Sequence, residues 1–86
     1  MPKDPPSVRI SHRVADLLRQ ERERQGLSMT ATAAKAGLSQ QSLSYVERYL
    51  RNPSLDTLLR ITSALGIELG PIVQAAEQEI KGKLDE

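Results

Sequence analysis

Apolar residues recur every three or four positions along most of this chain, which is the period of one face of an α-helix. The pattern is interrupted at Gly26, Gly37, Asn52 and Gly66, and after the first three of these a serine stands where the next apolar stretch begins. Serine is a preferred helix N-cap, and glycine often follows the last residue of a helix. The predicted helices cover about residues 11–25, 29–36, 40–48, 55–65 and 71–80. No strand is predicted, so the fold class is all-α.

The two ends of the chain are predicted to lie outside the packed domain. Residues 1–10 contain three prolines and no apolar period, so we expect a flexible arm before a first helix capped by Ser11. Residues 81–86 follow the last apolar period and are expected to fray as an acidic tail. Residues 11–80 then form one domain, which suits a chain of 86 residues.

Charge is distributed unevenly, although the net charge is only +1. Residues 1–60 carry ten Lys/Arg and six Asp/Glu, a balance of +4, whereas residues 61–86 carry two and five, a balance of −3. A basic face near the N-terminal helices would suit nucleic acid, but ordinary surface charge explains the split equally well. The chain has no cysteine, no secretory signal and no apolar run of about 20 residues, so we expect a cytoplasmic protein without membrane contact.

Two adjacent short helices carry the most informative pattern. Helices 29–36 and 40–48 are joined by a tight turn at Gly37 and Leu38, which is typical of a helix-turn-helix. Gln40 and Gln41 open the second of these helices, where a groove-reading helix places its base-contacting side chains. A glutamine amide matches the edge of adenine in the major groove, although two solvated glutamines would also be unexceptional at a helix start.

The joint spacing of these elements resembles the Cro/CI-type helix-turn-helix domain, also called the XRE family, whose fold is lambda-repressor-like. The matching positions are Arg22, Gly26, Leu27, Ser28, Ala33, Gly37, Leu38, Ser39, Glu47, Asn52, Pro53, Ser54, Leu55, Thr57, Leu58, Ala64, Leu65 and Gly66. The stretch QQSL is also similar to the recognition helix of lambdoid phage repressors. The resemblance covers about residues 11–80 and implies a five-helix DNA-binding domain.

The resemblance further implies residue roles. Gln41 would read adenine, Arg51 and Asn52 would hold phosphate, and Tyr45 would contact the groove, unless its ring belongs to the core. The implied DNA-binding residues are Ser28, Ser39, Gln40, Gln41, Ser42, Ser44, Tyr45, Arg48, Arg51 and Asn52.

One implied pair is structural, and two positions depart from the family pattern. Arg22 and Glu47 would form an ion pair that ties the first helix to the end of the third. Met29 stands where the family commonly has a phosphate-contacting glutamine, and Tyr49 where it commonly has glycine. Because a tyrosine at positive φ is strained, we expect the third helix to continue past Tyr49 for part of a turn.

The expected function is sequence-specific binding of double-stranded DNA by a transcriptional regulator, as a repressor acting as a homodimer on a palindromic operator. Helix 71–80 and the acidic tail are the expected dimer surface. The alternative is an antitoxin that binds a protein toxin and autoregulates its operon, and a third reading is a protein adaptor. No nucleophile elbow or phosphate-binding glycine loop is present, and His12 alone cannot form a metal cluster, so neither an enzyme nor a cofactor is expected.

Overall fold

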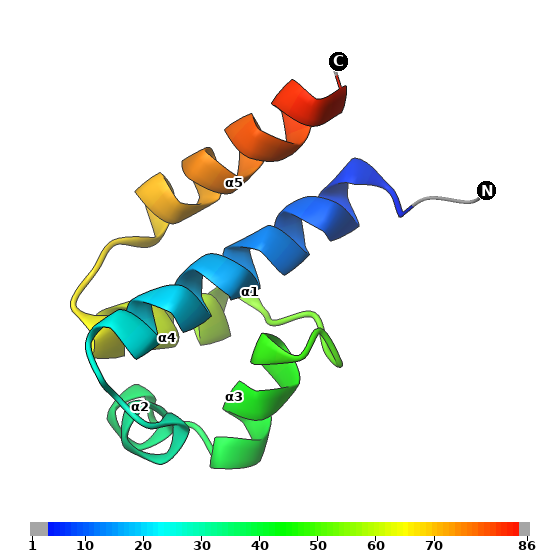
Figure 1. Cartoon of the computed structure of the whole chain (residues 1–86). Helices are drawn as coiled ribbons and strands as arrows, with labels where there is room; N and C mark the ends of the chain where they lie inside the picture. The colour runs from blue at the N-terminus through cyan, green and yellow to red at the C-terminus, as the bar shows by residue number, and fades with distance from the viewer. Residues whose placement is uncertain (1–3, 85–86) are drawn as a thin grey trace.

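The described part of the chain, residues 4–84 of a computed structural model, folds into five α-helices and contains no strand (Figure 1). The helices are α1 (Pro6–Arg24), α2 (Met29–Ala36), α3 (Gln40–Glu47), α4 (Leu55–Leu65) and α5 (Leu69–Leu84). The predicted all-α class and the order of the helices are confirmed. No helix among these residues is both long and apolar enough to span a membrane.

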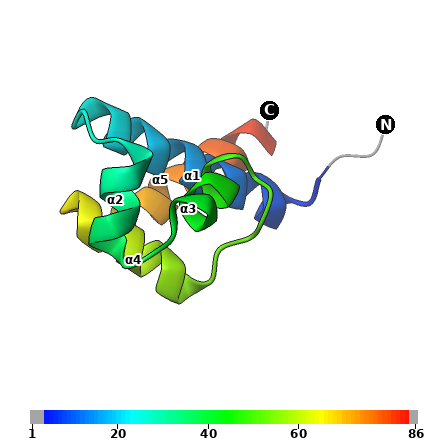
Figure 2. The same cartoon turned by 90° about the horizontal axis from the view of Figure 1, so that it is seen from below.

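α1 lies at the centre of the arrangement. α5 packs along one side of it and runs in the opposite direction, while α2, α3 and α4 close the other side (Figures 1 and 2). Every helix contributes residues to a single core, and each buries its apolar face against the other helices. The buried core residues are Val14, Ala15, Leu18, Ala33, Leu43, Val46, Ile61, Leu65 and Ala76.

The starts of three helices use one and the same device. The Oγ atoms of Ser28, Ser39 and Ser54 each accept a hydrogen bond from the backbone N–H three residues later, at 3.0 Å. Each cap satisfies one of the N–H groups that a helix start leaves without a partner, and contributes about 1 kcal/mol. Gly37 and Gly66 end α2 and α4 in the left-handed conformation at φ 70°. These predicted caps and stops are confirmed.

α1 begins earlier than expected. The prediction that the first helix starts at a Ser11 cap is wrong, because residues 6–10 are already helical. The N–H groups of Val8 and Arg9 both donate to the carbonyl of Pro5, at 3.0 and 3.2 Å. Pro6 suits the first helical position, where its fixed φ is already helical and its missing N–H would have no partner. Ile10 packs against the core and extends the contact of α1 with its neighbours.

α3 ends sooner than expected, so the prediction that it continues past Tyr49 is wrong. Its last residue is Glu47, and Tyr49 adopts the left-handed conformation with φ 63°. The N–H of Leu50 donates to the carbonyl of Tyr45 at 2.8 Å, and that of Tyr49 to the carbonyl of Val46 at 3.2 Å. These two bonds form a Schellman motif, which closes the helix with a residue other than glycine at the left-handed position.

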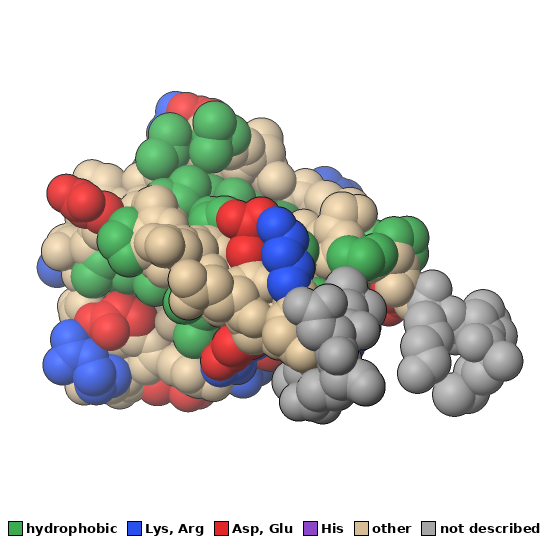
Figure 3. All heavy atoms as spheres, turned by 90° about the horizontal axis from the view of Figure 1, so that it is seen from above, with side chains coloured by type: hydrophobic (Ala, Val, Ile, Leu, Met, Phe, Trp, Pro, Cys, Tyr) green, Lys and Arg blue, Asp and Glu red, His purple; other side chains and the backbone are tan. Residues whose placement is uncertain are grey.

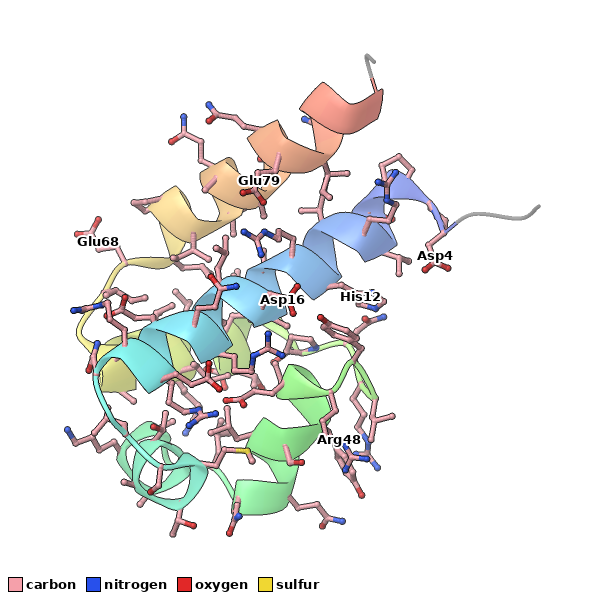
Figure 4. All side chains as sticks on the ribbon, in the orientation of Figure 1. Asp4, His12, Asp16, Arg48, Glu68 and Glu79 are labelled. Atoms are coloured by element: carbon pink, nitrogen blue, oxygen red, sulfur yellow. The ribbon has the colours of Figure 1, made fainter. Side chains whose placement is uncertain are left out.

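Contacts from α1 hold Tyr49 in this unfavourable conformation. The Tyr49 hydroxyl donates a hydrogen bond to the Asp16 carboxylate, and the His12 ring stacks on the tyrosine ring with centroids 4.3 Å apart. Both α1 side chains point toward the segment that follows α3 (Figure 4). The hydrogen bond to Asp16 raises the pKa of Tyr49, and partial burial acts in the same direction. These contacts with α1 therefore offset the backbone strain of Tyr49, a residue type that rarely adopts positive φ.

α5 is longer than expected at both ends. It begins at Leu69, so Pro71 falls within its first turn, and it continues to Leu84. Residues 81–84, which were expected to fray, therefore belong to the helix. The remainder of the predicted arm, residues 1–3, and of the predicted tail, residues 85–86, lies outside the described residues.

Candidate nucleic-acid interface

α3 is held against the core by one face, which leaves its other face to solvent. Leu43 and Val46 are buried among the core residues, as their three-residue spacing predicts. Gln40 and Gln41 are exposed at the start of the helix, where the Ser39 cap fixes the direction of the first turn. α2 and α3 lie together on one side of the molecule (Figure 2). The arrangement presents the N-terminal half of α3 to a partner.

The first turn of α2 supports Gln40. The Thr30 hydroxyl donates a hydrogen bond to Gln40 Oε1 at 3.1 Å, which joins the two helices of the helix-turn-helix across their exposed edge. Thr30 is exposed and belongs to this surface, yet the sequence did not single it out. The available signal was its place at the start of α2, which a helix-turn-helix brings beside the start of the next helix.

Gln41, Tyr45 and Arg51 form a cluster that begins on α3 and ends on the loop after it. Gln41 Nε2 donates to the Tyr45 hydroxyl at 2.6 Å, and the Arg51 guanidinium lies over the Tyr45 ring, 4.7 Å from its centroid. Ser42, Tyr45, Arg51 and Asn52 share the wall of a hollow of ≈ 300 Å³ with the residues that start α4. Side chains from α3 and from the loop after it thus converge on one place.

Three exposed cations near this surface have no partner acid in the part of the chain that the structure describes. Within the described residues, no ion pair forms at Lys35, Arg48 or Arg51, and all three are exposed. Arg48 points outward from the C-terminal end of α3 (Figure 4). By contrast, Arg13 is paired with Glu79. Exposed cations without a partner carboxylate among the described residues remain available to an external anion such as phosphate.

The remaining expected site residues have different surroundings. Ser39 Oγ, besides its capping bond, donates to Ser42 Oγ at 2.8 Å. Ser28 Oγ caps α2, and Ser44 is half-buried. Met29 is partly buried against the core, so this departure from the family pattern contributes packing instead of a polar contact. The serine hydroxyls at 28 and 39 therefore maintain the helix starts that lie on this surface.

Arg22 and Glu47 form a buried pair behind the surface. The guanidinium donates two hydrogen bonds to the carboxylate, from Nε at 2.7 Å and from Nη2 at 2.9 Å. Its Nη1 donates to the carbonyl of Leu27 at 2.8 Å. The two side chains are only 12% and 7% exposed, and the bonds to Glu47 raise the pKa of Arg22. The pair fixes α1, the turn before α2 and the end of α3 relative to one another.

The opposite side of the molecule has another character. Acidic, basic and apolar side chains are interspersed on the face that carries α5 (Figure 3). A hollow of ≈ 570 Å³ between α1 and α5 is lined by Arg9, His12, Arg13, Asp16, Glu79 and Ile80. Glu79 lies on the side of α5 that faces α1 (Figure 4). Among the described residues, no group of three or more His, Cys, Asp or Glu side chains is placed to hold a metal ion.

These features define the class of the protein, a helix-turn-helix DNA-binding domain, and comparison with known proteins specifies the family. Residues 18–72 match the family model described as helix-turn-helix. The chain belongs to this helix-turn-helix family, which is the XRE family that the sequence resembled.

Named relatives and a solved structure agree with this assignment. The chain is 31% identical over 74 residues to the HTH-type transcriptional regulator SinR of Bacillus subtilis, a match that covers 84% of this chain and 67% of SinR. It is 37% identical over 57 residues to the HTH-type transcriptional regulator y4dJ of Sinorhizobium fredii, covering 66% of this chain and 74% of y4dJ. The fold is shared with a mutant of the restriction-modification controller protein C.Esp1396I, with a TM-score of 0.73, 23% identity and coverage of 85% and 94% of the two chains. The protein is a DNA-binding transcriptional regulator and not an enzyme.

Proposed function

We propose that this protein binds a specific double-stranded DNA sequence by placing α3 in the major groove. The observation that carries the proposal is the pair of exposed amides, Gln40 and Gln41, at the capped start of α3. Lys35 on α2 and Arg48 and Arg51 after α3 are exposed, and none of them forms an ion pair with an acid that the structure describes. Amides that face base edges would supply the specificity, and free cations that face phosphates would supply affinity that does not depend on sequence.

We further propose that two copies act together, as a repressor on a palindromic operator in the cytoplasm. One short recognition helix contacts only a few base pairs, whereas a two-fold dimer places two such helices about 34–36 Å apart on successive turns of the duplex. The large apolar side chains that remain exposed among the described residues include Leu50, Leu55 and Leu59, with 55%, 65% and 49% exposure. They lie on the loop after α3 and on α4, and this apolar surface supports α4 as the contact between copies in place of α5.

The test is selection of bound duplexes from a random DNA pool at about 150 mM salt, where casual charge contacts are largely screened. Wild type is expected to enrich an inverted repeat, and Gln41→Ala to relax one base position in each half-site. Gln78→Ala removes an exposed glutamine from α5 and is expected to select the wild-type sequence. If wild type enriches nothing, sequence-specific binding is contradicted, and the antitoxin alternative is then tested by capture of a protein toxin.

A further inference from the structure

We propose that Tyr45 is a positioning residue that sets the orientation of the Gln41 amide and thereby makes this position choose adenine over guanine. The proposal rests on the proposed function. Its starting point is the pair of contacts at Tyr45. The hydroxyl accepts a hydrogen bond from Gln41 Nε2 at 2.6 Å, and the ring is covered by the Arg51 guanidinium at 4.7 Å.

The hydrogen bond to Tyr45 occupies one N–H of the Gln41 amide and leaves its other polar atoms free to contact a base. An amide NH₂ has two N–H donors, and its oxygen accepts. When one N–H is donated to Tyr45, one donor and one acceptor remain. Adenine presents one acceptor, N7, and one donor, the N6 amino group, in the major groove, whereas guanine presents two acceptors, N7 and O6. The available atoms of Gln41 therefore match adenine and would place the amide oxygen against guanine O6.

The surroundings of Tyr45 favour this direction of the hydrogen bond. A phenol can donate as well as accept, so the Tyr45 hydroxyl could bond either end of an amide. Arg51 and Asn52 line the same hollow as Tyr45, and the Arg51 guanidinium attracts an anion to it. A phosphate oxygen only accepts, so a hydroxyl that donates to phosphate leaves its oxygen to accept from Gln41 Nε2. Contact with the DNA backbone would thus fix the amide that reads the base.

The test measures the ratio of affinities for two duplexes that differ only by adenine or guanine at the position read by Gln41. The duplexes come from the selected operator, and the affinities are measured at fixed salt. Tyr45→Phe keeps the ring under Arg51 and removes the hydroxyl. We expect it to reduce the preference for adenine by roughly 2- to 12-fold, the effect of one hydrogen bond. Tyr49→Phe is the matched control, because it removes the other tyrosine hydroxyl, which bonds to Asp16 of α1 and not to Gln41.

A double-mutant cycle separates positioning from independent contact. In a Gln41→Ala background, Tyr45→Phe is expected to leave the adenine-to-guanine ratio unchanged, since no amide remains to be oriented. Circular dichroism and thermal unfolding confirm that each variant is folded. The proposal is overturned if Gln41→Ala relaxes the ratio while Tyr45→Phe does not, or if the two effects simply add. Failure of wild type to select any sequence would instead contradict the proposed function.

Discussion

At the scale of the single residue, Tyr49 shows how a locally unfavourable conformation is retained. A left-handed backbone costs a residue other than glycine roughly 1–2 kcal/mol. The Asp16 hydrogen bond and the stack on His12 each contribute about 1 kcal/mol in the other direction. The tyrosine side chain therefore offsets the strain of its own backbone, and it also anchors the end of α3 to α1.

We predict that Tyr49→Gly lowers the free energy of unfolding by about 1 kcal/mol, measured by urea denaturation. Glycine relieves the backbone strain, but the variant loses both contacts with α1, and its unfolded chain gains conformational freedom. Gly26, at φ 70°, shows that glycine adopts nearly the same backbone conformation as Tyr49 elsewhere in this chain. A more stable variant would contradict this account, because strain would then outweigh the contacts.

At the scale of the elements, the Arg22–Glu47 pair joins helices that are distant in sequence. The hydrogen bonds of Arg22 reach α3 through Glu47 and the turn before α2 through the carbonyl of Leu27. Glu47 is buried and Arg22 is half-buried, so much of the hydration that each charge loses is compensated by the other. The pair therefore sets the position of the end of α3 relative to α1.

We predict that Glu47→Ala lowers the free energy of unfolding by about 3 kcal/mol, because the half-buried guanidinium loses the carboxylate that accepts two of its hydrogen bonds. The matched control is Asp56→Ala, which removes the acid of the exposed Arg60 pair on α4 and is expected to change stability by less than about 1 kcal/mol. Chemical denaturation of the two variants provides the comparison. If both variants lose the same free energy of unfolding, the burial of the Arg22–Glu47 pair does not determine how much it stabilises the fold.

A second junction between elements gives a pH prediction. Glu21 accepts hydrogen bonds from Arg24 and from Gln25, and Gln25 Nε2 also donates to the carbonyl of Leu65 at the end of α4, at 2.7 Å. The bond from Arg24, followed by that from Gln25, lowers the pKa of Glu21 from 4.5 to about 2.

Since the pKa of Glu21 is lower in the folded state, its contribution is fully present above pH 4.5 and is lost as pH falls toward 2. We predict that Tm falls over this range, and that Glu21→Gln reduces the part of the fall that this carboxylate causes. Thermal unfolding of both proteins from pH 6 to pH 2 tests the prediction, with Glu23→Gln as a control on the same helix. Superimposable profiles for wild type and Glu21→Gln would contradict it.

At the scale of the whole molecule, the exposed leucines lie on one helix and the loop before it. They are Leu50, Leu55 and Leu59, and the loop that carries Leu50 also carries Arg51. Because hydrophobic burial drives most association between protein chains, this apolar surface is suited to a second copy. Two copies joined there would form the assembly that a palindromic operator requires.

We predict that wild type sediments as a dimer and that Leu59→Lys shifts it toward the monomer, because a charge replaces apolar contact area. Gln78→Lys adds the same charge to an exposed position on α5 and is expected to leave the dimer intact. Sedimentation velocity over a range of protein concentrations measures both. Dissociation by Gln78→Lys alone would identify α5 as the contact, as first expected from the sequence, and a monomeric wild type would contradict the dimer.

The features that follow from local chemistry could be predicted from the sequence. The caps at Ser28, Ser39 and Ser54 and the stop at Gly37 depend only on residues within one turn, so their outcome needed no knowledge of the fold. The start of α1 at Pro6 was missed because prolines are equally typical of a flexible arm and of a first helical turn. The spacing of Leu43 and Val46 was enough to predict which face of α3 is buried.

The sequence by itself therefore determined the number of helices, the serine caps of α2, α3 and α4 and the helix-turn-helix, because these depend on periodicity and on short-range hydrogen bonds. Only the tertiary structure decided the conformation of Tyr49 and the support of Gln40 by Thr30. Each of these arrangements depends on side chains from segments that folding brings together, and the free energy of such contacts is absent until the helices pack. Local sequence thus positions the helices of the surface proposed to read DNA, and contacts between helices orient some of its side chains.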